Sequence, residues 1–226
     1  PRMDSVLAGL KKYRADVQFT YARGCGVLDG DDGEIEAAVE AAKDAELVVA
    51  VMGDKAGLIL DCTSGEARDR ATLELPGRQR ELLQRLKETG VPVALVLING
   101  RPFSLTWEDA NLSAILEAWL PGEEGALAIS KALFGEISPA GRLPITCPRA
   151  AGQVPVFYAH KPSGGKSRWK GAYVDESNLP LYAFGHGLTY TRFGYGNLKL
   201  PKAAPVDGQI VVEADVLNTG ETAVEE

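Results

Sequence analysis

VPVALVLI, at residues 91–98, is the stretch of sequence that decides the fold. The run is almost continuously apolar, and the turn-forming sequence NGRP at residues 99–102 ends it sharply. An uninterrupted apolar run of this length is typical of a strand that is buried on both faces of a parallel sheet. We therefore expect an α/β fold.

Helical and strand-like segments alternate on both sides of this run. Apolar residues at helical spacing predict helices at residues 3–13, 34–45, 78–88 and 123–133, with Asp32 as the N-cap of the second helix. Apolar or alternating runs predict further strands at residues 17–22, 47–52, 113–119 and 143–146. This order indicates a mostly parallel open sheet with helices on both faces. We expect residues 47–52, 91–98 and 113–119 to form adjacent parallel strands, and residues 148–195 to form an irregular arm.

A long loop, LILDCTSGEARDRATLELPG at residues 58–77, follows the strand predicted at residues 47–52. It lies at the carboxyl end of that strand, where open α/β sheets bind ligands. Such connections usually take about 2 to 6 residues, and longer ordered loops are usually functional. Four charged residues gather in this loop beside an apolar run: Glu66, Arg68, Asp69 and Arg70.

Two interpretations of this charged cluster follow from the residues alone. A carboxyl group against the apolar side chains of Leu58, Ile59 and Leu60 would keep its proton longer, which suits a general acid. Alternatively, the cluster is a solvated charge run that opens the next helix, with Glu66 and Asp69 near the positive end of the helix dipole.

Composition excludes several other classes of function. The net charge of −7 and the pI near 5.0 argue against nucleic acid or an anionic membrane as a partner. No apolar run approaches the roughly 18 residues of a membrane span. The three cysteines are far apart and show no CxxC pattern, so we expect no metal site. No glycine motif for a phosphate group is present, and we expect no cofactor.

Four motifs follow one another along the chain: GEARDRATLELPG (65–77), PVALVLINGRPFSLTW (92–107), AILEAWLPGEEGALAISKALFGEISPAGRLP (114–144) and PLYAFGHGLTYTRF (180–193). Together they resemble the second domain of glycoside hydrolase family 3, which contains β-glucosidases, β-xylosidases and related exo-acting enzymes. The resemblance covers residues 1–200 and implies an α/β sandwich with a sheet of about six strands. It implies that residues 201–226 form a linker and the start of a fibronectin type III-like domain.

The resemblance also implies a chemistry. Retaining glycosidases use two carboxyl groups about 5 to 5.5 Å apart, one as nucleophile and one as general acid and then base. In family 3 the nucleophile is an aspartate on an N-terminal (β/α)8 barrel, and the acid/base is a glutamate from a loop of the second domain. The matching residue here is Glu66, while Asp61 and Asp69 are other carboxylates in the same loop. These 226 residues hold no eightfold βα pattern, so the barrel would be a partner outside this sequence.

Further site residues are expected around Glu66. Arg68 and Arg70 would orient Glu66, or pin the loop by bidentate pairing with Asp69. His160 and Trp169 are candidates for contact with sugar, although both residue types also serve to cover a core. The expected substrate is an oligosaccharide or β-glycoside with a terminal non-reducing β-linked sugar. The sugar and the linkage stay open, and so does the location: the resemblance implies periplasmic or extracellular, and the sequence allows cytoplasmic.

The alternative is a non-catalytic, doubly wound α/β module that binds a ligand or has a structural role. Such a module predicts a glycine-rich phosphate loop directly after the first strand. The sequence ARGCGVLD at residues 22–29 matches that pattern poorly.

Overall fold

A computed structural model describes residues 3–159 and 173–225. The chain divides into two compact units, Pro1–Ser130 with Leu143–His186, and Lys131–Arg142 with Gly187–Glu226. No helix in the described ranges is long and apolar enough to cross a membrane. The boundary at residue 200 stays a prediction.

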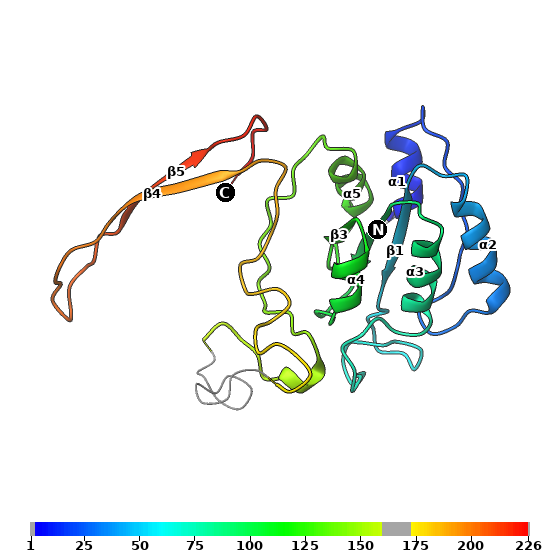
Figure 1. Ribbon diagram of the computed structural model, residues 1–226, viewed down its shortest axis with the longest axis horizontal. Coiled ribbons are helices and arrows are strands. Elements are labelled where there is room, and N and C mark those ends of the chain that lie inside the picture. The colour runs from blue at the N-terminus through cyan, green and yellow to red at the C-terminus, as the bar shows by residue number, and fades with distance from the viewer. Residues whose placement is uncertain (1–2, 160–172, 226) are drawn as a thin grey trace. The chain divides into compact units, whose positions relative to one another are not determined.

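A parallel sheet forms the centre of the first unit (Figure 1). Its strands are β1 (Val48–Gly53), β2 (Val93–Ile98) and β3 (Ala114–Glu117), in the order β1-β2-β3. Both neighbouring pairs are parallel. The expectation for residues 47–52, 91–98 and 113–119 is therefore confirmed. β2 lies between the other two strands, which explains why its sequence is apolar throughout.

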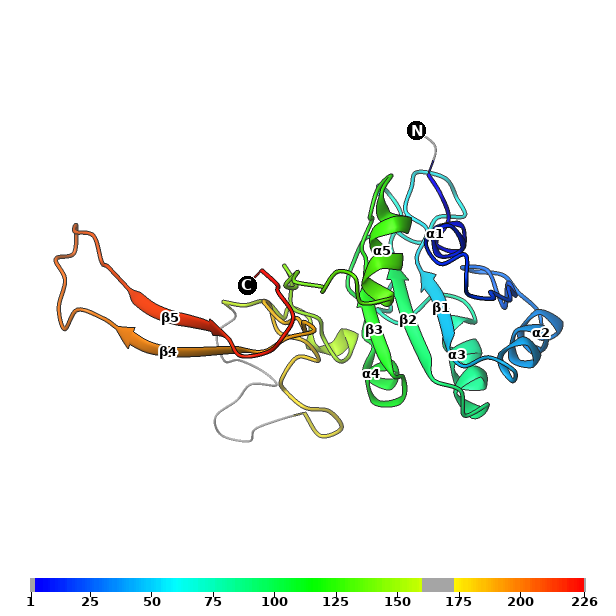
Figure 2. The same cartoon turned by 90° about the horizontal axis from the view of Figure 1, so that it is seen from above.

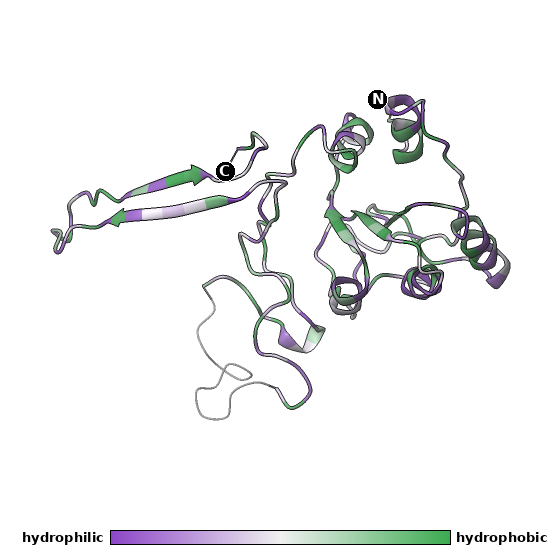
Figure 3. Cartoon of the chain, turned by 45° about the horizontal axis from the view of Figure 1, so that its top comes forward, coloured by the Kyte–Doolittle hydropathy of each residue, from purple (hydrophilic) through white to green (hydrophobic). Residues whose placement is uncertain are grey.

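Helices cover both faces of this sheet. They are α1 (Val6–Tyr13), α2 (Asp32–Ala42), α3 (Gln79–Glu88), α4 (Thr106–Asn111) and α5 (Gly125–Leu133). Figures 2 and 3 show α1 and α5 on one side of the sheet and α3 and α4 on the other, with α2 beside α3. The predicted α/β class with helices on both faces is confirmed.

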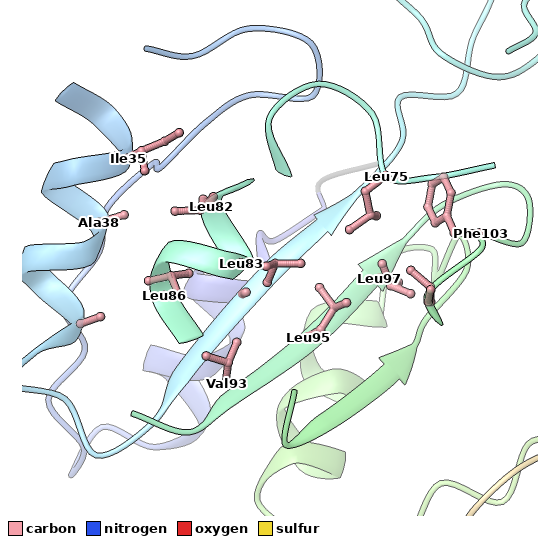
Figure 4. Close-up of a cluster of buried hydrophobic side chains, with 13 residues drawn as sticks. Ile35, Ala38, Leu75, Leu82, Leu83, Leu86, Val93, Leu95, Leu97 and Phe103 are labelled. Carbon is pink, nitrogen blue, oxygen red and sulfur yellow. The ribbon is translucent and has the colours of Figure 1, made fainter. Parts of the chain in front are cut away.

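The main hydrophobic core lies between the sheet and the helices α2 and α3 (Figure 4). Leu83 of α3 is completely buried, as are Leu95 and Leu97 of β2. On the opposite face α1 and α5 approach closely at Gly9, where an added Cβ would lie 2.6 Å from the backbone oxygen of Ala126. The apolar residues on both sides hold the carboxyl ends of the strands in place.

Three details of the predicted elements need correction. The N-cap of α2 is Asp31, whose side chain accepts the Glu34 N–H at 2.9 Å, and not Asp32. Helix α4 was not expected. In the described part of the chain the parallel sheet has three strands, whereas the family resemblance implied about six.

The two expected strands that do not form fail for different reasons. Residues 17–20 alternate in exposure as a strand does, but no ladder pairs residues 17–22 with another strand in the described residues. Residues 143–146 bond to the arm instead of the sheet, because the Leu143 N–H donates to the His186 oxygen at 2.8 Å. Pro144 has no N–H to donate to a ladder, which also limits a strand there. The described part of the arm includes a 3-10 turn, Ala151–Gln153.

The second unit contains an antiparallel pair, β4 (Phe193–Lys199) and β5 (Glu213–Asn218). The alternating sequence GQIVVEADV at residues 208–216 predicts a strand, whereas β5 begins and ends later, at Glu213 and Asn218. Every residue of β5 is exposed. Two strands alone are marginally stable in water.

Candidate active site

The loop between β1 and α3 carries the predicted site, and its base is closed by backbone hydrogen bonds. An isolated bridge pairs Ala56 with Ser64, and the Gly57 N–H donates to the Ser64 oxygen at 3.1 Å. Cys62, Thr63 and Ser64 are buried beneath it. By contrast, Leu58, Ile59 and Leu60 form an exposed apolar tip, residues 58–60, with 74%, 61% and 86% of their surfaces exposed. The base of the loop is thus fixed by hydrogen bonds, whereas its apolar tip is exposed to solvent.

Glu66 lies in a tight turn directly after this base. The Arg68 N–H donates to the Gly65 oxygen at 3.1 Å, and Ala67 has a left-handed backbone with φ of 57°. The Glu66 side chain is exposed, and its carboxylate has no hydrogen bond or ion pair with any described residue. The alternative of a charge run opening a helix is wrong in its geometry, because α3 begins at Gln79. Residues 58–60, the apolar neighbours expected for this carboxylate, are themselves exposed.

Arg68 and Arg70 pin the loop, as expected, but through different partners. Arg68 donates from Nε to the Cys62 oxygen at 3.1 Å and from Nη2 to the Leu60 oxygen. Arg70 donates to the Glu74 oxygen at 2.8 Å and to a threonine hydroxyl within the loop. The predicted bidentate pairing of these arginines with Asp69 is therefore wrong.

Asp69 pairs with Arg101, a residue that the sequence analysis did not assign to the site. Arg101 Nη1 donates to Asp69 Oδ1, and this bond holds the pKa of Asp69 below its ordinary value. The other guanidinium nitrogen of Arg101 donates to the Thr63 oxygen at 2.6 Å. The sequence could have indicated this residue, because the turn sequence NGRP follows the apolar run that ends at residue 98. This turn places Arg101 at the carboxyl end of β2, beside the end of β1.

A polar cluster lies beneath Arg101, at the carboxyl ends of the three strands, in which Asn99 is fully buried and Asp54 and Glu117 are partly buried. Asp54 Oδ1 accepts the Gly100 N–H at 3.1 Å, and the Asn99 amide donates to the Arg101 oxygen at 2.7 Å. Glu117 Oε1 accepts the Trp119 N–H at 3.1 Å. Burial raises the pKa of Glu117 to about 7. The sequence does not single out these residues, because each one has the pattern of a strand end.

The remaining predicted residues are less informative. His160 and Trp169 lie outside the described residues, so their contact with sugar stays a prediction. Asp61 forms an ion pair with Lys55 on the exposed side of the loop. Among the described residues, no group of three or more His, Cys, Asp or Glu is placed to hold a metal ion.

The alternative of a phosphate-binding module can be tested at residues 22–29. The Arg23 guanidinium is already bound by two carboxylates, Asp29 at 2.8 Å and Glu34 at 2.5 Å. The nearby cavity measures about 240 Å³, below the roughly 300–1,000 Å³ of typical ligand pockets. Asp29 and Glu34 neutralise the Arg23 guanidinium, which a phosphate group would otherwise need as its partner.

Comparison with known proteins places this chain in a family. The model of the glycosyl hydrolase family 3 C-terminal domain matches residues 1–190. The chain belongs to this family. Its site loop is thus the β1–α3 loop of a family 3 C-terminal domain, as the sequence motifs indicated.

Relatives of this family 3 domain are glycoside hydrolases by name. It is 38% identical to a periplasmic β-glucosidase of Salmonella typhimurium over 96% of the chain, and 40% identical to a β-xylosidase of Formosa agariphila over 100% of the chain. The chain spans 31% of the length of each of these two relatives.

Solved structures show the same fold. A β-glucosidase from Erythrobacter marinus matches with a TM-score of 0.83 and 35% identity, and one from Listeria innocua, solved with glucose, matches with 0.84 and 28%. Each match covers 96% of this family 3 domain, and 32% and 30% of the two solved chains.

Proposed function

We propose that this family 3 domain supplies the general acid/base, Glu66, to a retaining exo-acting β-glycosidase of the β-glucosidase type. Its partner would be an N-terminal (β/α)8 barrel of the same protein, which carries the nucleophilic aspartate. The substrate would be an oligosaccharide or β-glycoside whose terminal non-reducing sugar enters the barrel. The domain would also form a wall of the outer subsites.

The observation that carries this proposal is the contrast between Glu66 and its surroundings. The loop is held by the backbone bridge at Ser64 and by the guanidinium groups of Arg68 and Arg101. Glu66 alone projects from this framework with an exposed carboxyl group that is unpaired within the described residues. A general acid needs a carboxyl that is fixed in position and free to reach the substrate. Asp69 suits that role less, because Arg101 holds it as a carboxylate.

The proposed chemistry runs in two steps. As the nucleophile attacks the anomeric carbon, the protonated Glu66 gives its proton to the leaving-group oxygen. The Glu66 carboxylate then takes a proton from water as the water attacks the glycosyl-enzyme, and this returns Glu66 to its acid form. A barrel wall over Glu66 would provide the apolar surroundings that keep it protonated at the start.

The test is the dependence of rate on the leaving group in the full-length protein. Glu66→Ala should slow hydrolysis of a disaccharide by roughly 10²- to 10⁴-fold, because a basic alkoxide must be protonated as the bond breaks. Glycosylation by a dinitrophenyl glycoside, whose phenolate leaves unaided, should slow far less. Asp69→Ala is the matched comparison. If Glu66→Ala keeps near-normal rates on the disaccharide while Asp69→Ala loses them, the acid/base is Asp69.

A further inference from the structure

We infer that Arg101 is the positioning residue for Glu66; the inference rests on the proposed function of Glu66 as the acid/base. Arg101 contacts the site loop at two points that bracket Glu66 evenly. Nη2 donates to the oxygen of Thr63, three residues before Glu66, at 2.6 Å, and Nη1 donates to the carboxylate of Asp69, three residues after it. One guanidinium group therefore spans the two sides of the turn that presents Glu66.

The bracketing matters because Glu66 has no tether of its own within the described residues. Its position is set by the backbone from residue 63 to residue 69. Arg68 binds this segment to the rest of the same loop, through the oxygen of Cys62. Arg101 is different, because it belongs to the turn after β2 and joins the loop to the sheet.

The turn that carries Arg101 is itself fixed from below. The side chain of Asn99 is fully buried, and its amide donates to the Arg101 backbone oxygen at 2.7 Å. The Gly100 N–H donates to Asp54 at the end of β1, and a Cβ at Gly100 would lie only 3.8 Å from the Ser64 hydroxyl. The turn thus packs against the base of the site loop. Arg101 therefore connects the turn that carries Glu66 to the ends of β1 and β2.

The charge arrangement fits positioning better than surface pairing. The Asp69 side chain is 85% exposed, whereas that of Arg101 is 23% exposed. Exposed ion pairs usually contribute little to stability. Loss of Arg101 should therefore change the free energy of unfolding only a little, but it should displace Glu66. A displacement of about 1 Å at a catalytic group can lower the rate about 10²-fold.

The experiment uses the full-length protein and three variants, with Arg85→Ala as control. Arg85 is a surface arginine on α3 that pairs only with Glu36 and Glu88 in the described residues. Arg101→Ala should lower kcat for a disaccharide about 10- to 100-fold and leave glycosylation by a dinitrophenyl glycoside nearly unchanged. Arg101→Lys keeps the charge but not the fork that reaches both partners, so its loss should be similar. Asp69→Asn removes the negative charge from one of the two contacts while keeping an oxygen that can accept from Arg101, so it should show a smaller loss with the same dependence on the leaving group.

A double-mutant cycle decides whether Arg101 acts through Glu66. In a Glu66→Ala background, Arg101→Ala should have almost no further effect, since the group that it positions is gone. If Arg101→Ala costs the same factor with and without Glu66, or slows all substrates equally, the inference is overturned. If Glu66→Ala itself leaves the disaccharide rate unchanged, the proposed function fails instead, so the two failures are distinguishable.

Discussion

Glu117 shows at the scale of one residue how burial at the sheet edge changes chemistry. Its carboxyl lies at the end of β3 and receives hydrogen bonds from the Trp119 N–H at 3.1 Å and the Asn99 amide at 3.4 Å. Desolvation nevertheless dominates, and the nearby Asp54 carboxylate adds to it, so the pKa of Glu117 rises to about 7. Burial raises the pKa of Cys147 to about 11, and the nearby negative charge of Glu117 contributes to this rise.

Glu117 should therefore make the stability of this chain depend on pH. With a pKa of about 7 when folded and 4.5 when unfolded, Glu117 binds more protons in the folded state between these values. Its contribution is fully present below pH 4.5 and is lost as pH rises through 7, a fall of about 3 kcal/mol in the free energy of unfolding. Glu117→Gln should remove this fall in urea titrations from pH 4 to 8.

The control for that series is Glu46→Gln, which changes an exposed glutamate. Its stability should follow the pH dependence of the unchanged chain. Parallel curves for Glu117→Gln and the unchanged chain would show that Glu117 titrates normally.

At the scale of elements, the β1–α3 loop depends on Gly65, the residue before Glu66. Gly65 has φ of 111°, in the region that side chains rarely adopt. A Cβ there would lie 2.5 Å from the Gly57 oxygen and 2.8 Å from the Gly57 nitrogen, both backbone atoms. The Gly57 backbone cannot move away from such a Cβ without losing its hydrogen bond to Ser64.

Gly65→Ala should accordingly lower the free energy of unfolding by about 1–3 kcal/mol, the usual cost of a strained backbone position. Gly152→Ala is the matched control, because nothing lies within 4 Å of an added Cβ there and its φ is not left-handed. Its effect should stay within about 0.5 kcal/mol. Equal urea midpoints for the two variants would contradict the tight contact at Gly65.

The same scale shows how far sequence patterns reach. The strands β1, β2 and β3 could be predicted because each is a long enough apolar or alternating run. Helix α4 could not, since its six residues are too few for a helical period to emerge. The pairing of Arg101 with Asp69 joins residues 32 apart in sequence, and sequence spacing does not say which charges meet when two loops share a sheet edge. The residues alone place Glu66 in a charged cluster, and only the motif GEARDR predicts it as the acid/base, because an exposed glutamate has no distinctive pattern of its own.

At the scale of the whole molecule, the central question is what this chain does without a barrel. Its described residues show one exposed, unpaired carboxylate in the site loop, whereas a retaining glycosidase needs two carboxyl groups about 5 to 5.5 Å apart. We propose that the second is the aspartate of the partner barrel. The purified 226-residue chain should then show no turnover of an aryl β-glucoside or β-xyloside. Turnover by the chain that disappears in a Glu66→Ala control would contradict this expectation.

The most direct measurement of the central claim is the product of azide rescue in the full-length protein. With Glu66→Ala, a dinitrophenyl β-glycoside should form the glycosyl-enzyme and then stall, because no base activates water. Azide needs no base, so it should restore turnover. It should also yield the β-glycosyl azide, since two displacements retain the configuration at the anomeric carbon. No rescue, with equal losses for all leaving groups, would contradict the acid/base role of Glu66. Formation of the α-glycosyl azide would contradict it as well, since that product marks the loss of the nucleophile.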